Sequence, residues 1–414
     1  MIDYIPTIIT FFFLLIILSY YFLIFVKSKK PEKEKIFSSI TVIIPARNEE
    51  KYIGKCIESV LEADFDGEKE VIVIDDGSRD KTSEIVKKFP VRLIRQKHSG
   101  KSASINKALP MAKGELVAIV DADSIIHKDS LKEVVKEVER KNVAAASCVI
   151  RVKNRRKFIC MWVHIEQIYN SLVRHILSKV NANIVTPGPL SVYRKKELLD
   201  AGGFSTKGFS EDIDITIRLI RRGHRIGFAR NALSETNMPY KPKEFLRQRT
   251  RFARGLINIL KTHLRINKTI IDIYTIPIFL FSYIQAIIMG SFIIYQIFSG
   301  YIKYFISNGI LFNFYVVRFF FEWFSIVGFV KWMIGAFIGQ VPLNFVNIIG
   351  ILSTLLSYPL FFYAIVRYDK KFDWWHIIPL FFMFPFWLLI MFIYILCIPE
   401  YFIEHQYNIW KKNE

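Results

Sequence analysis

Short apolar runs alternate with helical patterns between residues 39 and 123. The runs, which are rich in β-branched residues, are Ile40–Ile44, Val71–Ile74, Val91–Ile94 and Leu116–Val120. Between the first two runs, apolar residues recur at the spacing of one helix face. Continuous apolar strands that alternate with helices are typical of a parallel sheet with both faces covered. The pattern therefore predicts a Rossmann-like α/β domain with a mostly parallel sheet.

The pattern becomes mixed between residues 143 and 240. It predicts a strand over Ala144–Val152, a long helix over Phe158–Leu177 and a second helix over Ile213–Arg222. We include this stretch in the same domain.

Long apolar segments flank the predicted domain. Ile5–Val26 has 22 residues without a charge, which as a helix would rise about 33 Å, enough to cross a bilayer. Three later segments have the same character: Ile273–Phe298, Val341–Val366 and Ile377–Ile398. We expect all four to span a membrane.

A further apolar segment, Tyr301–Gln340, is ambiguous because it contains Arg318, Glu322 and Lys331. Charge inside a membrane is either functional or a sign that the segment does not cross. The basic loop Arg367–Lys371 favours the second interpretation. If basic loops lie on the cytoplasmic side, residues 301–340 are interfacial or re-entrant.

The charge of the chain is concentrated in its first two thirds. The 414 residues carry a net charge of +20, yet residues 269–414 hold 8 basic and 7 acidic residues. The excess therefore lies beside apolar segments, including five lysines between residues 27 and 35. This distribution favours a cytoplasmic domain lying on an anionic membrane over nucleic-acid binding. With 52% apolar residues, the composition also excludes intrinsic disorder.

The segment Lys241–Lys268 joins the two regions. It carries nine basic residues and one acid, while Phe245, Phe252 and Leu256 fall on one helical face. We expect a basic amphipathic helix in the membrane interface. The chain thus divides into an anchor and linker (1–37), a cytoplasmic domain (38–240), an interface helix (241–268) and a transmembrane region (269–414).

Polar groups follow the predicted strands where each strand ends. Asp75-Asp76-Gly77-Ser78 follows the second run, and Asp121-Ala122-Asp123 follows the fourth. Carboxyl ends of parallel strands are where such sheets bind ligands, and paired carboxylates suit a divalent cation. Turn formation and helix capping would also account for these residues.

Several motifs that occur in order along the chain favour ligand binding over turn formation and helix capping alone. They are Pro45-Ala46-Arg47-Asn48-Glu49, Asp75–Ser78, Lys101 with Asn106, Asp121–Asp123, Thr186–Arg194, Gly202-Gly203-Phe204, Ser210-Glu211-Asp212 and Gln248-Arg249-Thr250-Arg251-Phe252. With these motifs the chain resembles the family 2 glycosyltransferases of GT-A fold. Together with the apolar segments, it is similar to their membrane-embedded hyaluronan, cellulose and poly-N-acetylglucosamine synthases. The resemblance implies inverting transfer of a sugar from a nucleotide diphosphate donor.

The resemblance also implies roles for individual residues. The nucleotide would be bound by Pro45, Arg47, Glu49, Asp76, Lys101 and Asp121. Asp123, with Asp121, would hold Mg²⁺ or Mn²⁺, and Asp212, beside Glu211, would be the catalytic base. The acceptor or the diphosphate would contact Gly188, Gln248, Arg249, Arg251 and Phe252. Two residues depart from the family pattern, because Ser210 stands for the usual Thr and Phe252 for the usual Trp.

Simpler interpretations of these residues remain open. Asp212 could merely cap a helix, and most of the arginines could be membrane-surface charge.

The sequence therefore predicts a multi-pass cell-membrane glycosyltransferase with a cytoplasmic catalytic domain. We expect a UDP-linked donor, N-acetylglucosamine or glucose first, and a carbohydrate or lipid-linked acceptor. We expect the enzyme to elongate a polysaccharide and to extrude the polymer through the protein. Such export would need a polar lining, for which the candidates are Gln285, Gln296, Arg318, Glu322, Gln340 and Asn344. The alternatives are transfer of one sugar to a polyprenyl-phosphate or other lipid, and a catalytically silent membrane scaffold. The donor sugar, the linkage and the oligomeric state are left open.

Overall fold

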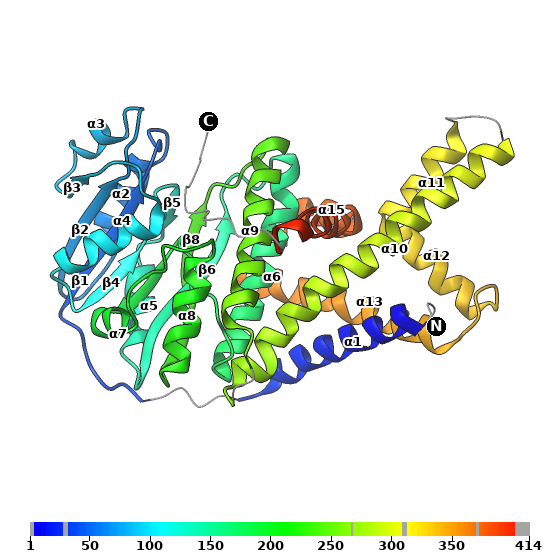
Figure 1. The fold of residues 1–414 in the computed structure, drawn as a ribbon, viewed down its shortest axis with the longest axis horizontal. Helices are drawn as coiled ribbons and strands as arrows, with labels where there is room; N and C mark the ends of the chain where they lie inside the picture. The colour runs from blue at the N-terminus through cyan, green and yellow to red at the C-terminus, as the bar shows by residue number, and fades with distance from the viewer. Residues whose placement is uncertain (1–3, 28–31, 266–267, 309–312, 370–371, 402–414) are drawn as a thin grey trace.

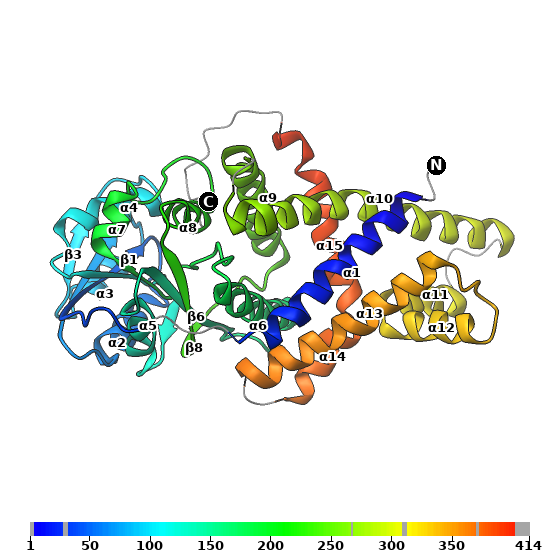
Figure 2. The same ribbon diagram turned by 90° about the horizontal axis from the view of Figure 1, so that it is seen from below.

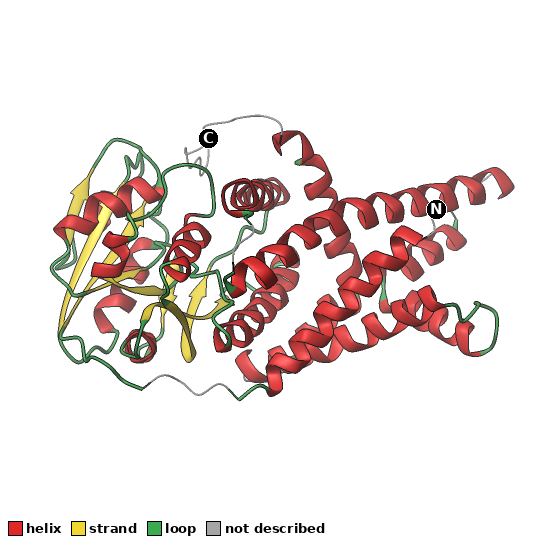
Figure 3. Cartoon of the chain, turned by 60° about the horizontal axis from the view of Figure 1, so that its bottom comes forward, coloured by secondary structure: helices red, strands yellow, loops and turns green. Residues whose placement is uncertain are grey.

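The computed structural model of the chain describes residues 4–27, 32–265, 268–308, 313–369 and 372–401. An α/β part contains the sheet, and a second part is helical (Figure 1, Figure 3). Four lysines used above to predict orientation, Lys29, Lys30, Lys370 and Lys371, lie outside the described residues.

The described part of the chain forms one eight-stranded sheet in the order β3-β2-β1-β4-β7-β6-β8-β5. The strands are β1 Ser39–Ala46, β2 Glu68–Asp75, β3 Arg92–Arg95, β4 Leu116–Ile119, β5 Ser124–Ile126, β6 Val143–Val152, β7 Ser191–Arg194 and β8 Arg225–Thr236. Strands β3, β2, β1 and β4 are parallel, whereas β7 is antiparallel to both of its neighbours. The predicted Rossmann-like, mostly parallel sheet is confirmed.

Helices cover both faces of the sheet because alternate strand residues point to opposite faces. On β1, Ile43 packs with α4 (Lys101–Ala108), α7 (Lys195–Asp200) and α8 (Glu211–Arg221). Its neighbours Val42 and Ile44 pack on the other face, which is covered by α2 Ile53–Glu62, α3 Thr82–Val86 and α5 Ser130–Val138. The apolar runs of the sequence are therefore buried from both sides.

Three long helices extend away from the sheet (Figure 1). They are α1 Tyr4–Phe25, α10 Ile276–Asn308 and α13 Phe345–Ala364. Each belongs to a stretch long and apolar enough to cross a membrane: Ile5–Phe25, Ile271–Ser307 and Asn347–Asp369. These stretches correspond to the first three predicted spans.

The fourth predicted span, Ile377–Ile398, is not one straight helix. It is divided into α14 Ile377–Phe381 and α15 Met383–Leu396, which are bent by 54°. Pro385 explains the break, because it has no N–H to donate to the carbonyl of Phe381. Helix α15 crosses α10 instead of running beside it (Figure 2). With 14 residues it rises about 21 Å, less than the thickness of a bilayer core.

The ambiguous segment after Tyr301 is also bent. Helix α10 continues to Asn308, and α11 Phe314–Phe324 and α12 Ile326–Phe337 then meet at 84°. Near the bend, Glu322 pairs with Arg318 at 2.9 Å and with Lys331 at 2.9 Å. The three charges thus compensate one another locally. This geometry supports the interfacial or re-entrant hypothesis over a straight crossing.

The predicted interface helix exists as α9 Pro242–His263, but its apolar face differs from expectation. Phe245, Ile259 and Leu260 are buried within the protein, and α9 packs against α8, α10 and α15. Helical periodicity reveals an apolar face without revealing whether lipid or protein covers it. The prediction that this face lies in the membrane interface is therefore corrected.

The predicted boundary at residue 240 is not a packing boundary either. Helix α6, Phe158–Lys179, lies inside the predicted 38–240 unit but shares a core cluster with α1, α13 and α15. Phe245 of α9 joins the same cluster. The sheet part and the helical part are therefore continuous through α6 and α9.

This arrangement predicts three crossings, by α1, α10 and α13, with the α11–α12 hairpin on the side opposite the sheet. Tyr315 and Leu343 are 64% and 59% exposed near that far end. Cysteines placed there should react with a membrane-impermeant maleimide on intact cells, because they would lie outside. A cysteine at Lys207 should react only after permeabilisation. The four native cysteines are buried and give little background. Labelling of residue 207 on intact cells would contradict this topology.

Candidate functional site

A small cavity lies at the carboxyl end of β4. Its walls come from the start of α4, the loop before β7 and the start of α8. The lining residues are Lys101, Ile105, Ile119, Thr186, Gly188, Ser191, Tyr193, Phe204, Glu211 and Asp212. Four of the residues named in the sequence analysis, Lys101, Gly188, Glu211 and Asp212, thus line one cavity. Asp121 adjoins it through Lys101.

Lys101 is the first residue of α4 and the cation of the cavity. Its Nζ lies 2.5 Å from Oδ1 of Asp121 and 3.6 Å from Oε1 of Glu211. Burial alone would lower the pKa of Lys101, but these carboxylates and Asp212 outweigh it and raise that pKa. The lysine is therefore protonated at neutral pH.

Gly188 is required by the close packing around this ion pair. A Cβ atom at residue 188 would lie 2.5 Å from both the Lys101 Nζ and the Asp121 Oδ2. In addition, the N–H of Asp121 donates to the Gly188 carbonyl at 3.0 Å. Any larger residue would have to displace the carboxylate or the ammonium group.

Asp212 lies in the first turn of α8, next to Glu211. Burial and the charge of Glu211 raise the pKa of Asp212 to about 7, although Lys101 opposes the shift. The N–H of Ile213 donates to Asp212 Oδ1 at 2.9 Å. Asp212 therefore also binds a backbone N–H at the start of α8, as the helix-capping interpretation expects. A carboxylate with a pKa near neutrality, lining a cavity, is suited to accept a proton.

Asp76 is buried and bound by the loop that precedes Lys101. It accepts hydrogen bonds from the backbone N–H groups of Ser99 (2.8 Å) and Gly100 (2.9 Å), and from the Gln96 side chain (2.8 Å). Burial would raise the pKa of Asp76, but these hydrogen bonds and that with His98 lower it. Asp76 therefore fixes the loop that delivers Lys101, and its contact with a nucleotide stays a prediction.

His98 was missed by the sequence analysis. Its Nδ1 lies 2.7 Å from Asp76 Oδ2, and its Nε2 lies 3.0 Å from a guanidinium nitrogen of Arg47. The imidazole thus joins two of the predicted nucleotide-binding residues. The sequence feature that could have identified His98 is its position shortly after β3, because the ends of parallel strands gather at one edge of the sheet.

The remaining residues predicted at the nucleotide lie on β1 and the turn after it. Pro45 belongs to β1 and is paired in register with Ile74 of β2. Glu49 is buried, and its backbone N–H donates to the Thr82 hydroxyl at 2.8 Å. The turn is therefore fixed to the segment that follows β2.

The donor set around Asp121 and Asp123 fits a divalent cation. Asp123 directly precedes β5, and its Oδ1 accepts a weak hydrogen bond from the Thr236 hydroxyl at 3.3 Å. Carboxylate oxygens are the ligands that Mg²⁺ and Mn²⁺ prefer. Around Lys101, three carboxylates face one ammonium group. The local excess of negative charge therefore favours an added cation.

Arg249 lies elsewhere than the sequence analysis predicted. It is buried, and its guanidinium forms a two-pronged ion pair with Glu166 of α6, at 2.7 and 2.5 Å. The aromatic rings of Phe245 and Phe386 lie within 5.5 Å of it. Its charge is already compensated, so the predicted contact with a diphosphate is replaced by a structural ion pair between α9 and α6.

The other residues of this motif on α9 could still contact a ligand. Gln248 has a buried Oε1 with no hydrogen-bond partner among the described residues. Phe252 is 42% exposed, and the Arg251 guanidinium lies 5.7 Å from its ring. An exposed aromatic face beside a cation is a surface on which a sugar could stack.

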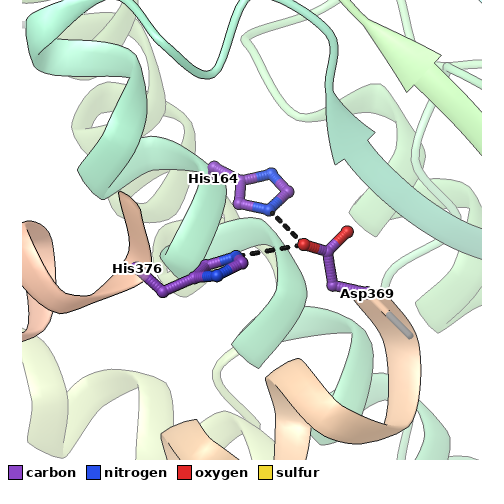
Figure 4. Close-up of side chains that lie close together, drawn as sticks. All are labelled: His164, Asp369 and His376. Carbon is purple, nitrogen blue, oxygen red and sulfur yellow. Dashed lines mark hydrogen bonds and ion pairs between the residues drawn. The ribbon is translucent and has the colours of Figure 1, made fainter. Parts of the chain in front are cut away.

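A second cluster of titratable groups lies just after α13. Asp369 Oδ2 lies 3.1 Å from the Nε2 of His164 and 3.0 Å from that of His376 (Figure 4). Arg151 and Arg155 pair with the same carboxylate, at 2.9 and 3.0 Å. The cluster therefore fastens the end of α13 to β6 and α6.

The hydrogen-bond pattern does not favour a metal at this cluster. The N–H of Val152 donates to the Nδ1 of His164 at 3.3 Å, which places the His164 proton on Nε2, facing Asp369. Burial lowers the pKa of His164, so the ring is neutral. A cation would meet this N–H and two guanidinium groups. We therefore assign the cluster as a structural junction.

Comparison with known proteins identifies relatives of part of the chain. Residues 41–198 match the family described as Glycosyl transferase family 2. An N-acetylglucosaminyltransferase of Azorhizobium caulinodans is 27% identical over 58% of this chain and 65% of its own length. The poly-beta-1,6-N-acetyl-D-glucosamine synthase of Staphylococcus aureus (strain COL) is 27% identical over 52% of this chain and 54% of its own length. The chain thus matches little more than half of such relatives.

A solved structure resembles most of the chain. The mannosyltransferase PcManGT from Pyrobaculum calidifontis, in complex with GDP-Man and Mn²⁺, has a TM-score of 0.59 and 20% identity. The match covers 90% of this chain and 100% of that one. At this identity the likeness establishes the fold alone, and the predicted GT-A fold is confirmed.

Proposed function

We propose that this chain, which carries a glycosyltransferase family 2 domain, transfers a sugar from a nucleotide diphosphate donor to an acceptor at the membrane, with inversion. The donor we favour is UDP-N-acetylglucosamine, because two relatives are named for N-acetylglucosamine transfer. The observation that carries the proposal is the placement of Asp212, with its raised pKa, in one cavity with Lys101. A silent scaffold would have no need of this arrangement.

In the proposed reaction Asp212 acts as the base. Its carboxylate takes the proton of the acceptor hydroxyl, and the acceptor oxygen then bonds to the anomeric carbon. The bond between that carbon and the diphosphate breaks on the opposite face, which inverts the configuration. Lys101 and the cation-binding carboxylates Asp121 and Asp123 lie on the donor side. The protonated Lys101 can stabilise the negative charge that develops on the diphosphate.

A divalent cation held by Asp123 and Asp121 would supply further positive charge for the leaving diphosphate. The residues of the chain orient the reactants. The Asp76–His98–Arg47 network fixes the edge where a nucleotide would lie. Gln248 and Phe252 would contact the acceptor from α9.

We favour a membrane-embedded lipid or lipid-linked acceptor over an exported polymer. Of the six polar residues considered as passage lining, Gln296, Arg318, Gln340 and Asn344 are exposed. Glu322 is occupied by its two ion pairs, which leaves Gln285 as a half-buried polar side chain on α10. Four of the six side chains are thus exposed and are not enclosed by the described part of the protein. Transport of a hydrophilic chain would require an enclosed polar path.

Polymer elongation is the second candidate. The observation that favours it is the name of the Staphylococcus aureus relative, a polysaccharide synthase. The exposed ring of Phe252 could also hold a growing chain.

Product analysis tests the proposal and separates the two candidates. Detergent-purified protein should be incubated with membrane lipid extract, Mn²⁺ and a panel of sugar nucleotides, and the products sized. We expect release of UDP from UDP-N-acetylglucosamine and one sugar on an extractable lipid. Long glycosidase-sensitive chains would instead establish elongation. No nucleotide release from any donor would overturn the proposal and favour the scaffold alternative.

Metal dependence is a second expectation. Chelation by EDTA should abolish transfer, and Asp123→Asn should nearly do so, because the charge of the diphosphate would remain uncompensated. Asp129→Asn, an exposed acid nearby, is the matched control and should keep normal activity. Initial rates with and without added Mn²⁺ provide the measurement. Full turnover in excess EDTA would be incompatible with the proposed role of the two carboxylates.

The pH dependence of turnover reports on Asp212. A base must be deprotonated, so kcat should fall about tenfold per pH unit below a pKa of about 7 and level off above it. Asp212→Asn should lower kcat by about 10²–10⁴-fold while UDP still binds. Asp200→Asn, an exposed acid on α7, is the control. A D212N enzyme with normal turnover would leave Asp212 as a helix-terminus residue only.

A further inference from the structure

The loop before Asp212 rests on α9. Ser210, the last residue of that loop, has φ 71° and ψ 48°, the left-handed conformation that residues other than glycine rarely adopt. Two residues earlier, Gly208 has φ 76°. Two residues with positive φ so close together indicate that contacts with the surrounding structure hold the loop in this conformation.

Two residues of α9 pack against this loop. A Cβ atom at residue 255 would overlap the Ser210 hydroxyl, and a Cβ at residue 208 would overlap the Asn258 side chain. Gly255 and Asn258 are three residues apart, so they share one face of α9. Glycine is unfavourable inside a helix, and this close approach is a specific reason for it at residue 255.

The position of the loop fixes the position of the first turn of α8. The N–H of Asp214 donates to the Ser210 carbonyl at 3.1 Å, the bond that closes the turn containing Glu211 and Asp212. The side chain of Asp214 is tied to the same α9, because its Oδ1 lies 2.8 Å from the Nε2 of His263. Helix α8 is therefore held by α9 at two places, with Asp212 between them in sequence.

We propose that Gly255 is a positioning residue, whose missing side chain lets Ser210 seat against α9 and thereby places the Asp212 carboxylate in the cavity. This inference rests on the proposed role of Asp212 as base. Any residue with a Cβ at position 255 crowds the loop even if the Ser210 hydroxyl turns aside, because the new Cβ would lie 3.2 Å from the Ser210 Cβ and 3.4 Å from the Phe209 Cβ. The loop is then displaced, and the first turn of α8 moves with it. The nucleotide edge, built from the strand ends, stays in place.

The test is a pair of substitutions with compensating sizes. Gly255→Ala should lower kcat by at least about tenfold, because a misplaced base loses the alignment that proton transfer needs. The KM for UDP-N-acetylglucosamine should stay within about twofold, since the nucleotide edge is unaffected. The apparent pKa that governs kcat should fall below that of the wild type, as Asp212 leaves its half-buried position beside Glu211.

Adding Ser210→Gly removes the atoms that the new methyl group would meet, and glycine adopts positive φ freely. The S210G/G255A enzyme should therefore recover to within about threefold of S210G alone. A purely structural weakening of α9 by Gly255→Ala would not be relieved in this way. Failure of the double variant to recover, or a G255A enzyme with wild-type kcat and pH profile, would overturn the inference.

Gly54→Ala is the matched control, because Gly54 is also inside a helix but a Cβ there would meet its nearest neighbour at an ordinary 3.6 Å. It should leave activity unchanged. Trypsin cleavage after the exposed Lys207 gives a readout that needs no catalysis. Cleavage should be faster in G255A and return to the S210G rate in the double variant. Absence of transferase activity in the wild type would overturn the proposed function, whereas unchanged cleavage would overturn the placement of the loop.

Discussion

The charge balance of one small cavity constrains the rest of the site. Asp121, Glu211 and Asp212 contribute three carboxylates around the single ammonium group of Lys101. Carboxylates crowded together and shielded from water cannot all ionise at their usual pH. Asp121 is paired directly with the lysine, and Asp212 has the raised pKa. The different roles proposed for Asp121, on the donor side, and for Asp212, as proton acceptor, therefore arise from position, because both residues are aspartates.

The sequence predicts which polar residues gather at this edge of the sheet, because each of them follows an apolar strand. A buried parallel strand is a continuous apolar run, and the first polar residue after it lies at the ligand-binding edge of the sheet. Asp76 and Asp121 were located in this way, and His98 obeys the same rule although it was overlooked. The placement of Asp212 could not be deduced so directly, since it depends on a loop with left-handed residues packed on a helix some forty residues later.

The misplaced predictions share a physical cause. Apolar periodicity and basic charge are equally compatible with lipid and with protein as the neighbouring medium. Thus Phe245, Ile259 and Leu260 of α9 are buried within the protein while Phe252 stays exposed, and Arg249 forms its ion pair with Glu166. Composition also made residues 377–398 resemble one straight span, whereas the structure bends this segment by 54° beside Pro385.

These tertiary contacts make the helical part a component of the site as well as an anchor. The sheet edge brings Lys101 and Asp121 together without help from the helical part. Asp212 is on α8, whose first turn and whose Asp214 both rest on α9. Helix α9 in turn packs against α10 and α15, while Glu166 ties it to α6. The position of Asp212, the proposed base, relative to the sheet edge is therefore set by the assembly of the sheet with the helical part, and an isolated sheet domain would lack the surface that fixes it.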